Sequence, residues 1–170
     1  MIQEAMKAVA EDLNAMLRRK RGDSRDRVIL GGLPKPGGTG EDEAGDCICL
    51  TLTQITEEKN VASMAAPRGA PESGPRVSAP VSLNLRLLFS AHYARYEVGL
   101  EMISEVIAYL HVKPLFTRAN TPTLHSGLDR LTLEMVKVTS EEQSQLWSML
   151  GRDYTPSAIY SMRMLTLGGV

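Results

Sequence analysis

Apolar residues recur with a helical period at the start of the chain, at Ile2, Met6, Val9, Leu13 and Met16. Positions three or four residues apart lie on one face of a helix, so this pattern predicts an amphipathic first helix. Gly22 and Asp23 follow it as a stop signal. A second stripe of the same period consists of Tyr96, Leu100, Ile103, Ile107 and Leu110. It predicts a helix over about residues 93–110, which Pro114 ends.

Alternation with a period of two predicts strands in other segments. The clearest lies in residues 81–89, whose apolar side is formed by Val81, Leu83, Leu85, Leu87 and Phe89. Shorter or weaker patterns predict strands over residues 28–33, 47–55, 128–138 and 158–167. Ser140 and Gln143 suit a capping box at the start of a third helix, which Gly151 ends.

The predicted elements follow one another in the order α-β-β-β-α-β-α-β. Five strands and three helices suit a single α+β domain over residues 1–170, with a mixed or antiparallel sheet and helices on one face. Residues 34–45 and 61–80 are rich in Gly, Pro, Ala and charged residues and poor in large apolar ones. Long flexible loops are therefore expected in these two segments.

The composition is that of an ordinary globular domain. The 170 residues are 43% hydrophobic and 23% charged, with a net charge of −1. These values argue against a disordered chain and against a generally basic nucleic-acid binder. No apolar run approaches the ~20 residues of a membrane helix. The first residues include Glu4, Glu11 and Asp12 and do not resemble a secretory signal.

Residues that commonly carry chemistry are scattered along the chain. His92, His111 and His125 stand at the ends of predicted elements or in a loop, which favours structural or surface roles over acid–base catalysis. Cys47 and Cys49 would share one face of a strand, and a single intervening residue is fewer than the usual zinc pair has. We expect two reduced thiols, no metal site and no cofactor.

The strongest local charge is a basic cluster formed by Arg18, Arg19, Lys20, Arg21, Arg25 and Arg27. An acidic stretch over residues 41–46 carries the opposite sign. In a nearly neutral chain, this segregation suggests contacts that set the register between neighbouring subunits or against the proteins on which they are seated. Because no aromatic residues are interleaved with the basic cluster, a solvated face or an acidic protein partner is favoured over nucleic acid.

Two long segments resemble one protein family. They are "VSLNLRLLFSAHYARYEVGLEMISEVIAYLHVKPLFT", residues 81–117, and "NTPTLHSGLDRLTLEMVKVTSEEQSQLWSMLGRDYTPSAIYSMRML", residues 120–165. Their most specific pieces are "SLNLRLLF", "GLDRLTLE" and "LWSMLG", in this order. They are similar to the tube-terminator, or cap, proteins of contractile injection systems, the phage-tail-like particles of the Photorhabdus virulence cassette and antifeeding prophage type. The likeness covers nearly the whole chain except residues 34–45 and 61–80.

The resemblance implies a structural protein without enzymatic activity. It implies a homohexameric ring seated on the end of the inner tube farthest from the baseplate, where it ends tube growth and anchors the last sheath layer. The implied partners are further copies of the chain, the tube protein and the sheath protein, with assembly in the bacterial cytoplasm. Some members carry a further C-terminal extension, and any function placed there is not expected of these 170 residues.

Two alternatives to a cap remain open at this point. One is another tail component, such as a tube–sheath connector or a baseplate protein. The other is a small enzyme that uses His92 or His125 with a nearby carboxylate.

Interface residues are predicted from charge and position. Those expected to set the register between subunits are Arg18, Arg19, Arg21, Arg25, Glu41, Asp42 and Glu43. Arg163 is a sheet-face or interface residue. Trp147 is a core residue or a binding anchor, and the neighbouring Leu146 and Leu150 favour the core. Exposed edges of the strands at residues 47–55 and 158–167 are candidate docking sites for partner strands.

Overall fold

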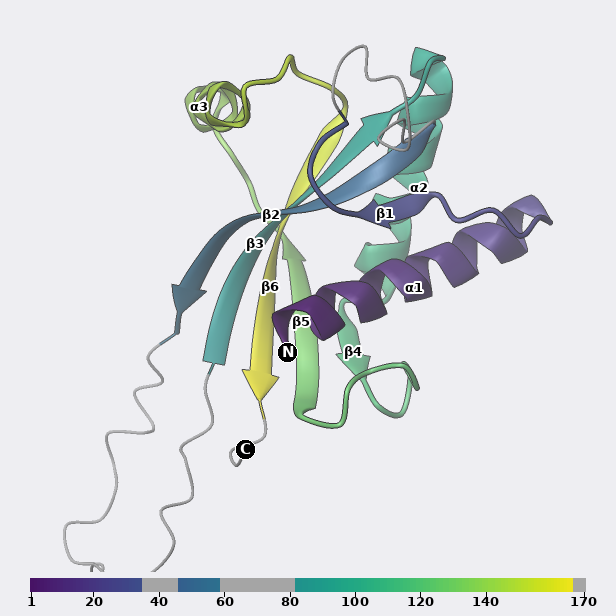
Figure 1. Ribbon diagram of the computed structural model, residues 1–170, viewed down its shortest axis with the longest axis vertical. Helices are drawn as coiled ribbons and strands as arrows, with labels where there is room; N and C mark the ends of the chain where they lie inside the picture. Colours follow the sequence, from purple (N-terminus) through teal and green to yellow (C-terminus); the bar gives the residue numbers. More distant parts are fainter. Residues whose placement is uncertain (35–45, 59–81, 167–170) are drawn as a thin grey trace, which may run out of the picture.

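The computed structural model describes residues 1–34, 46–58 and 82–166. Three helices and six strands follow one another along these residues (Figure 1). Their bounds are α1 (Ile2–Arg21), β1 (Val28–Leu30), β2 (Cys47–Glu57), β3 (Ser82–His92), α2 (Tyr96–Val112), β4 (Leu115–Thr117), β5 (Leu128–Met135), α3 (Ser140–Leu150) and β6 (Ser157–Thr166). The expected loops at 34–45 and 61–80 lie outside the described residues, apart from residue 34.

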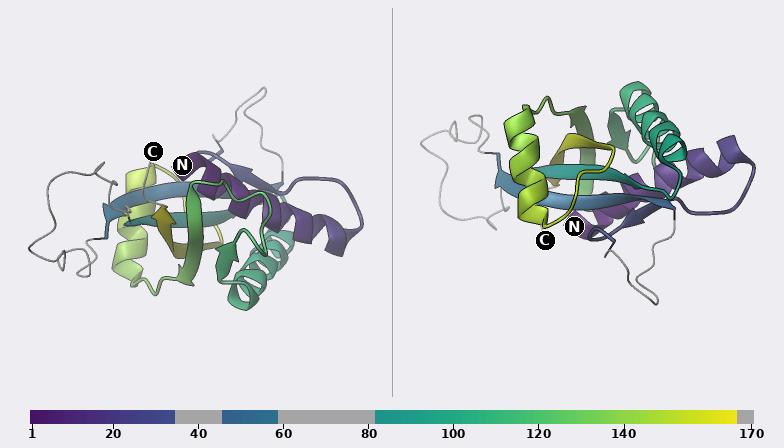
Figure 2. Two further views of the ribbon diagram at one scale, coloured as in Figure 1. Left: turned by 90° about the horizontal axis from the view of Figure 1, so that it is seen from below. Right: turned by 90° about the horizontal axis from the view of Figure 1, so that it is seen from above.

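The six strands form one mixed sheet in the order β1-β2-β3-β6-β5-β4. β1 pairs with β2 in parallel, and every other neighbouring pair is antiparallel. The sheet is strongly curled, so that β5 runs across the direction of β2 and β3 (Figure 2). The predicted α+β class is confirmed, and all five predicted strands are present. The sixth strand, β4, is only three residues long, too short to show the alternation that reveals a strand.

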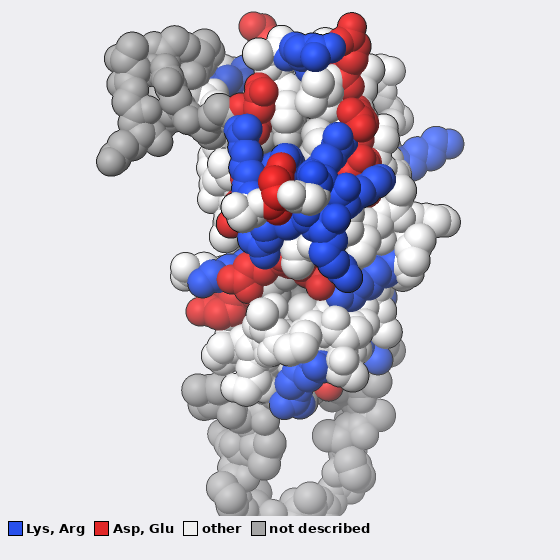
Figure 3. All heavy atoms as spheres, turned by 90° about the vertical axis from the view of Figure 1, so that its right-hand side faces the viewer, with Lys and Arg blue, Asp and Glu red and all other residues white. Residues whose placement is uncertain are grey.

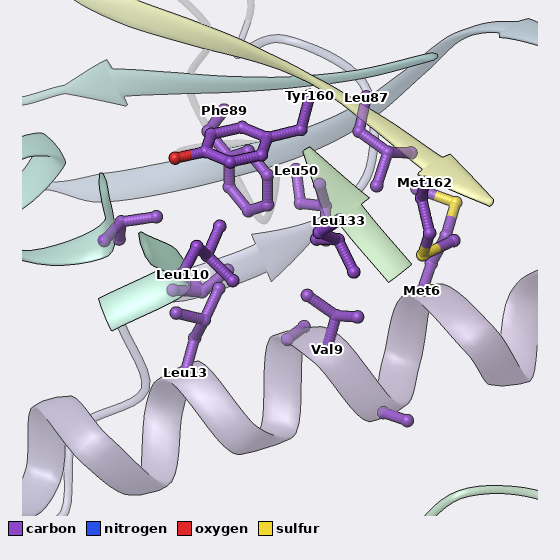
Figure 4. Close-up of a cluster of buried hydrophobic side chains, with 14 of the residues drawn as sticks. Met6, Val9, Leu13, Leu50, Leu87, Phe89, Leu110, Leu133, Tyr160 and Met162 are labelled. Carbon is purple, nitrogen blue, oxygen red and sulfur yellow. The ribbon is translucent and has the colours of Figure 1, made fainter. Parts of the chain in front are cut away.

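The main core lies between the inner face of the sheet and the helices α1 and α2. The apolar stripe of α1 points at this face, where Met6, Val9 and Leu13 meet side chains from the central strands (Figure 4). Phe89 on β3 and Tyr160 on β6 form an edge-to-face ring pair with centroids 5.5 Å apart, a favoured aromatic geometry. Gly22 and Gly151 end α1 and α3 with φ of 70° and 62°, which glycine adopts without strain.

Helix α3 packs on the opposite, outer face of the sheet, so the expectation that all helices share one face is wrong. Trp147 on α3 contacts Leu88 and Ile159, and these three residues form a second buried cluster. Leu88 points outward because its neighbours Leu87 and Phe89 belong to the inner core. The consecutive apolar run Leu87-Leu88-Phe89 is the sequence signal for a strand covered on both faces.

The capping box of α3 lies one residue earlier than predicted. Thr139, not Ser140, is the N-cap, and its hydroxyl accepts a hydrogen bond from the Glu142 N–H at 3.2 Å. The Glu142 carboxylate accepts the Thr139 N–H at 2.8 Å. This second bond is the main cause of the lowered pKa of Glu142. Ser and Thr are both good caps, so residue type alone did not select between the two registers.

A buried side chain ties β1 to α1. The Asn14 amide oxygen accepts the backbone N–H groups of Arg27 and Val28, both at 2.8 Å. Its amide nitrogen donates to the Val28 carbonyl oxygen at 2.9 Å. Since Asn14 is buried on the core-facing side of α1, these three hydrogen bonds fix where the edge strand β1 begins.

Candidate assembly surface

The basic cluster lies at the C-terminal end of α1 and in the segment that leads to β1. Figure 3 shows Lys and Arg side chains gathered on this face of the molecule, with Asp and Glu among them. Arg18 forms an ion pair with Asp26, and Arg27 forms one with Asp23. Four of the six basic residues have such pairs among the described residues; they are Arg18, Lys20, Arg21 and Arg27.

These internal pairs change which residues are available to a partner. Arg21 lies 2.9 Å from both Glu101 and Glu105 on α2, so it links two helices of the same chain. The Arg25 guanidinium donates to the Asp46 backbone carbonyl at 3.0 Å and has no carboxylate partner among the described residues. Arg19 likewise has no ion pair within that part of the chain and is exposed. Of the predicted interface arginines on this end, Arg19 and Arg25 therefore keep a charge that no described carboxylate pairs with.

The remaining predicted interface residues are not brought together with this cluster. Glu41, Asp42 and Glu43 lie outside the described residues, so their contact with the basic cluster stays a prediction. Arg163 lies on the outer face of the sheet, with 53% of its side chain exposed, and its Nε lies 2.9 Å from a carboxylate oxygen of Glu58. It belongs to a separate surface.

That separate surface is the part of the outer sheet face that α3 leaves uncovered. We call it the outer polar surface, and its residues are Gln54, Thr56, Asn84, Arg86, Ser161 and Arg163. Cross-strand pairing places Gln54, Arg86 and Ser161 side by side on three adjacent strands. Here the sheet carries polar residues where the α3 end carries Leu88 and Ile159, so this end is suited to water or to a polar partner.

Two adjoining hollows mark this surface. One, of about 270 Å³, is lined by Asn84 and Ser161 together with Gln54 and Arg86. The other, of about 450 Å³, lies against α3 and is also lined by Gln54 and Arg86. The Arg86 guanidinium makes no hydrogen bond or ion pair with any described residue. The polar side of the β3 alternation indicated Arg86 as a sheet-face residue, but not that its guanidinium is left without an ion pair within the described part of the chain.

A larger hollow of about 610 Å³ lies beside α3 and the turn that follows it. Trp147 lines it and forms an edge-to-face pair with Tyr154, with ring centroids 5.7 Å apart. Trp147 is only 4% exposed, which confirms the core role favoured from the sequence. Its indole N–H has no hydrogen-bond partner among the described residues.

The two strands predicted to offer docking edges occupy different positions in the sheet. β6 lies between β3 and β5 and pairs with both over most of its length, so the prediction that its edge is open is wrong. β2 is covered by β1 only as far as Leu50. The sequence shows which segments are strands, but strand order depends on contacts between distant residues.

In the described part of the chain, His92, His125 and the two cysteines contact close neighbours in the sequence. His92 Nε2 lies 2.9 Å from the Ser90 hydroxyl, and His125 Nδ1 accepts the Gly127 N–H, so neither bonds a carboxylate among the described residues. The sulfur atoms of Cys47 and Cys49 lie 3.7 Å apart, too far for a disulfide. No cluster of three potential metal ligands is found in residues 1–34, 46–58 and 82–166, and none of the helices described there is long and apolar enough to cross a membrane.

His92 makes the stability of the protein depend on pH. Burial is the main cause of its lowered pKa, with a smaller contribution from the charge of Arg152. A histidine whose folded pKa lies below its unfolded value binds more protons when unfolded, so stability is full above the unfolded value near 6.5 and falls as pH decreases. We expect His92→Gln to flatten the decline in unfolding free energy between pH 7 and pH 5. Urea unfolding across this range measures it; an unchanged slope in the variant contradicts it.

In the part of the chain that the structure describes, the surface carries arginines with and without carboxylate partners, a sheet face that α3 leaves uncovered and a strand edge that no described strand covers. A similar fold occurs in a solved sheath/tube terminator of an extracellular contractile injection system, the PVC particle in its extended state, with TM-score 0.63 and 19% identity over 99% of this chain and 57% of that one. The tube-terminating cap of the anti-feeding prophage matches with TM-score 0.53 and 17% identity, over 92% of this chain and 54% of that one. The chain therefore spans somewhat more than half the length of each of these proteins.

Residues 7–170 match the family model described as the Pvc16 N-terminal domain, and the chain belongs to that family. No curated protein sequence matches the chain. The resemblance seen in the sequence is thereby confirmed at the level of the family.

Proposed function

We propose that this chain is a cap that ends the inner tube of an extracellular contractile injection particle and joins it to the last layer of the sheath. The observation that carries the proposal is the family match together with a fold shared over 99% of the chain with a sheath/tube terminator. Its role is structural, not enzymatic. The described residues offer a basic cluster and a strand edge that no described strand covers, which are features that partners bind.

A cap must differ from the tube subunit in one geometric respect. Tube growth is open-ended because each added layer presents the same interface again. A cap matches that interface on one side and presents no copy of it on the other, and its copies close into a ring through head-to-tail contacts. We propose a ring of six copies that contacts the tube on one side and the sheath on its outside, assembled in the bacterial cytoplasm before the particle is released.

Deleting the gene tests this role against the other positions in the particle. Electron microscopy of particles made without the protein is expected to show tubes and sheaths of uncontrolled length. A baseplate protein is needed to start assembly, so its loss leaves no particles at all. Absence of particles, or particles of normal length, therefore contradicts the proposed cap.

Arg19 in α1 and Arg25 in the segment that follows it, neither of which a described carboxylate pairs with, are expected to contribute to ring closure. In the double variant Arg19→Glu and Arg25→Glu, the reversed charges repel the acidic residues of a neighbouring copy that the arginines would attract. We therefore expect ring formation to weaken by about tenfold or more. Sedimentation of the purified protein at low and high salt measures it, because such contacts are screened by salt. Arg130→Glu, an exposed reversal on β5, is the matched control. Equal ring formation by the double variant and the control rules out this contact.

A further inference from the structure

The two edges of the sheet are finished in different ways. At the β4 edge, the Asn120 side chain takes the place of a neighbouring strand. Its amide oxygen accepts the Thr117 N–H and its amide nitrogen donates to the Leu115 carbonyl, both at 2.8 Å. These are the backbone groups that a further strand would need, so this edge is closed to strand addition.

Beyond β1, no described strand covers the β2 edge. The last backbone contact on this side joins the Gly31 N–H to the Leu50 carbonyl at 3.2 Å. The Thr51 hydroxyl donates to the Gly31 carbonyl at 2.7 Å. Beyond it, as far as Glu57, β2 pairs with β3 on one side and with no described strand on the other. A run of strand with one unpaired side presents a template for a further strand.

The register shows which backbone groups point outward. The Glu58 N–H donates to the Ser82 carbonyl at 2.9 Å, and antiparallel hydrogen-bonded pairs alternate along a ladder. Thr56 therefore faces β3 through its backbone, whereas the N–H and C=O of Ile55 point away from the sheet. The Ile55 side chain is 53% exposed, so nothing described covers this position.

Arg86 supplies a charge beside the open edge. Gln54, its cross-strand partner, is the residue between Arg86 and the edge. The Arg86 guanidinium is half-buried, lines both hollows of the outer polar surface and forms no hydrogen bond or ion pair with a described residue. Glu142 lines one of these hollows with it, and the charge of Arg86 helps to lower the pKa of that carboxyl. Arg163 on the same surface is paired with Glu58. A partly desolvated guanidinium is strongly suited to a carboxylate, because charge-assisted hydrogen bonds are the strongest available to it.

We propose that the open β2 edge accepts an extended segment of another protein of the particle as an added strand, and that an acidic side chain of this segment binds Arg86. The main-chain groups of Ile55 supply hydrogen bonds that are independent of sequence. The carboxylate on Arg86 supplies selectivity for an acidic segment. This inference rests on the proposed function, since it assigns one of the contacts through which the cap is held in the particle.

The test uses overlapping fluorescein-labelled peptides of twelve residues that cover the tube and sheath proteins encoded with this chain. Fluorescence anisotropy measures their binding to the full chain. We expect at least one acidic peptide to bind.

Ile55→Pro removes the outward N–H at an edge position that tolerates proline, and binding is expected to weaken about tenfold or more. Ile55→Thr keeps that N–H and is expected to bind within about twofold of the unchanged chain.

Arg86 is tested with its own matched pair. Arg86→Gln is expected to weaken binding of the acidic peptide about tenfold, whereas Arg86→Lys keeps the charge and loses less. If Ile55→Pro does not fold, hydrogen exchange on the unchanged chain replaces it: the bound peptide must slow exchange of the Ile55 amide. No binding peptide, equal binding by the variants, an unprotected Ile55 amide or use of the edge by a second copy of the chain each overturns the inference.

The failure of this inference is distinguishable from failure of the cap. Wild-type protein that ends tube growth while no peptide binds at β2 leaves the proposed function standing and removes the docking edge. A peptide that binds at β2 in a protein that does not end tube growth supports the docking edge and contradicts the proposed function.

Discussion

Trp147→Ala lowers the free energy of unfolding by about 4 kcal/mol, the cost of removing a large buried aromatic side chain. The second core is small, with Leu88 and Ile159 as the other buried members, so little remains to hold α3 on the outer face once the indole is lost. Loss of α3 also removes one wall of the hollow beside Arg86. Chemical denaturation followed by circular dichroism measures the change.

The matched variant Trp147→Phe separates packing from hydrogen bonding. Because the indole N–H has no partner among the described residues, this change removes volume without removing a hydrogen bond, and a loss of about 1.5 kcal/mol or less is expected. A cost for Trp147→Phe equal to that of Trp147→Ala contradicts packing as the role of this residue.

Asn14→Ala has the second largest expected effect, a loss of about 3 kcal/mol. The change leaves the N–H groups of Arg27 and Val28 and the Val28 carbonyl without the partner that Asn14 provides. Buried backbone groups without partners are costly, so β1 should detach from α1 before the rest of the sheet unfolds. Hydrogen exchange of the β1 amides together with denaturant unfolding measures both effects.

Gln145→Ala is the control for Asn14→Ala, since it also removes an amide side chain but from the exposed surface of α3. Its expected cost is below about 0.5 kcal/mol. Comparable losses in the two variants are incompatible with a special role for the Asn14 hydrogen bonds.

Much of the fold could be predicted from the sequence because local period determines element type. The stripe of α1 and the alternation of β3 are long and regular, and both elements were predicted nearly where they lie. The prediction placed α3 on the wrong face of the sheet. Leu88, an apolar residue between two inner-face residues, indicates that the outer face is covered as well. β4 and the exact capping residue were missed because three residues are too few to show a period and because Thr139 and Ser140 are equivalent caps by type.

The candidate surface was less predictable. Charge along the chain identified the basic cluster, but not that Arg18 is paired with Asp26 inside it and Arg21 with Glu101 on α2. The position of β6 in the middle of the sheet follows from pairing with two strands that lie much earlier in the chain: Ser157 pairs with Ser90, and Tyr160 pairs with Met135. Such long-range pairing decides which edges are open, and no local pattern contains it.

The most direct test of the cap is to add the purified chain to its own tube subunits while they polymerise. Tube lengths measured by negative-stain electron microscopy are expected to shorten as the ratio of chain to tube subunit rises, with extra density at one end only. Tubes that keep growing to the same lengths at every ratio, or that carry the chain along their sides, contradict the account.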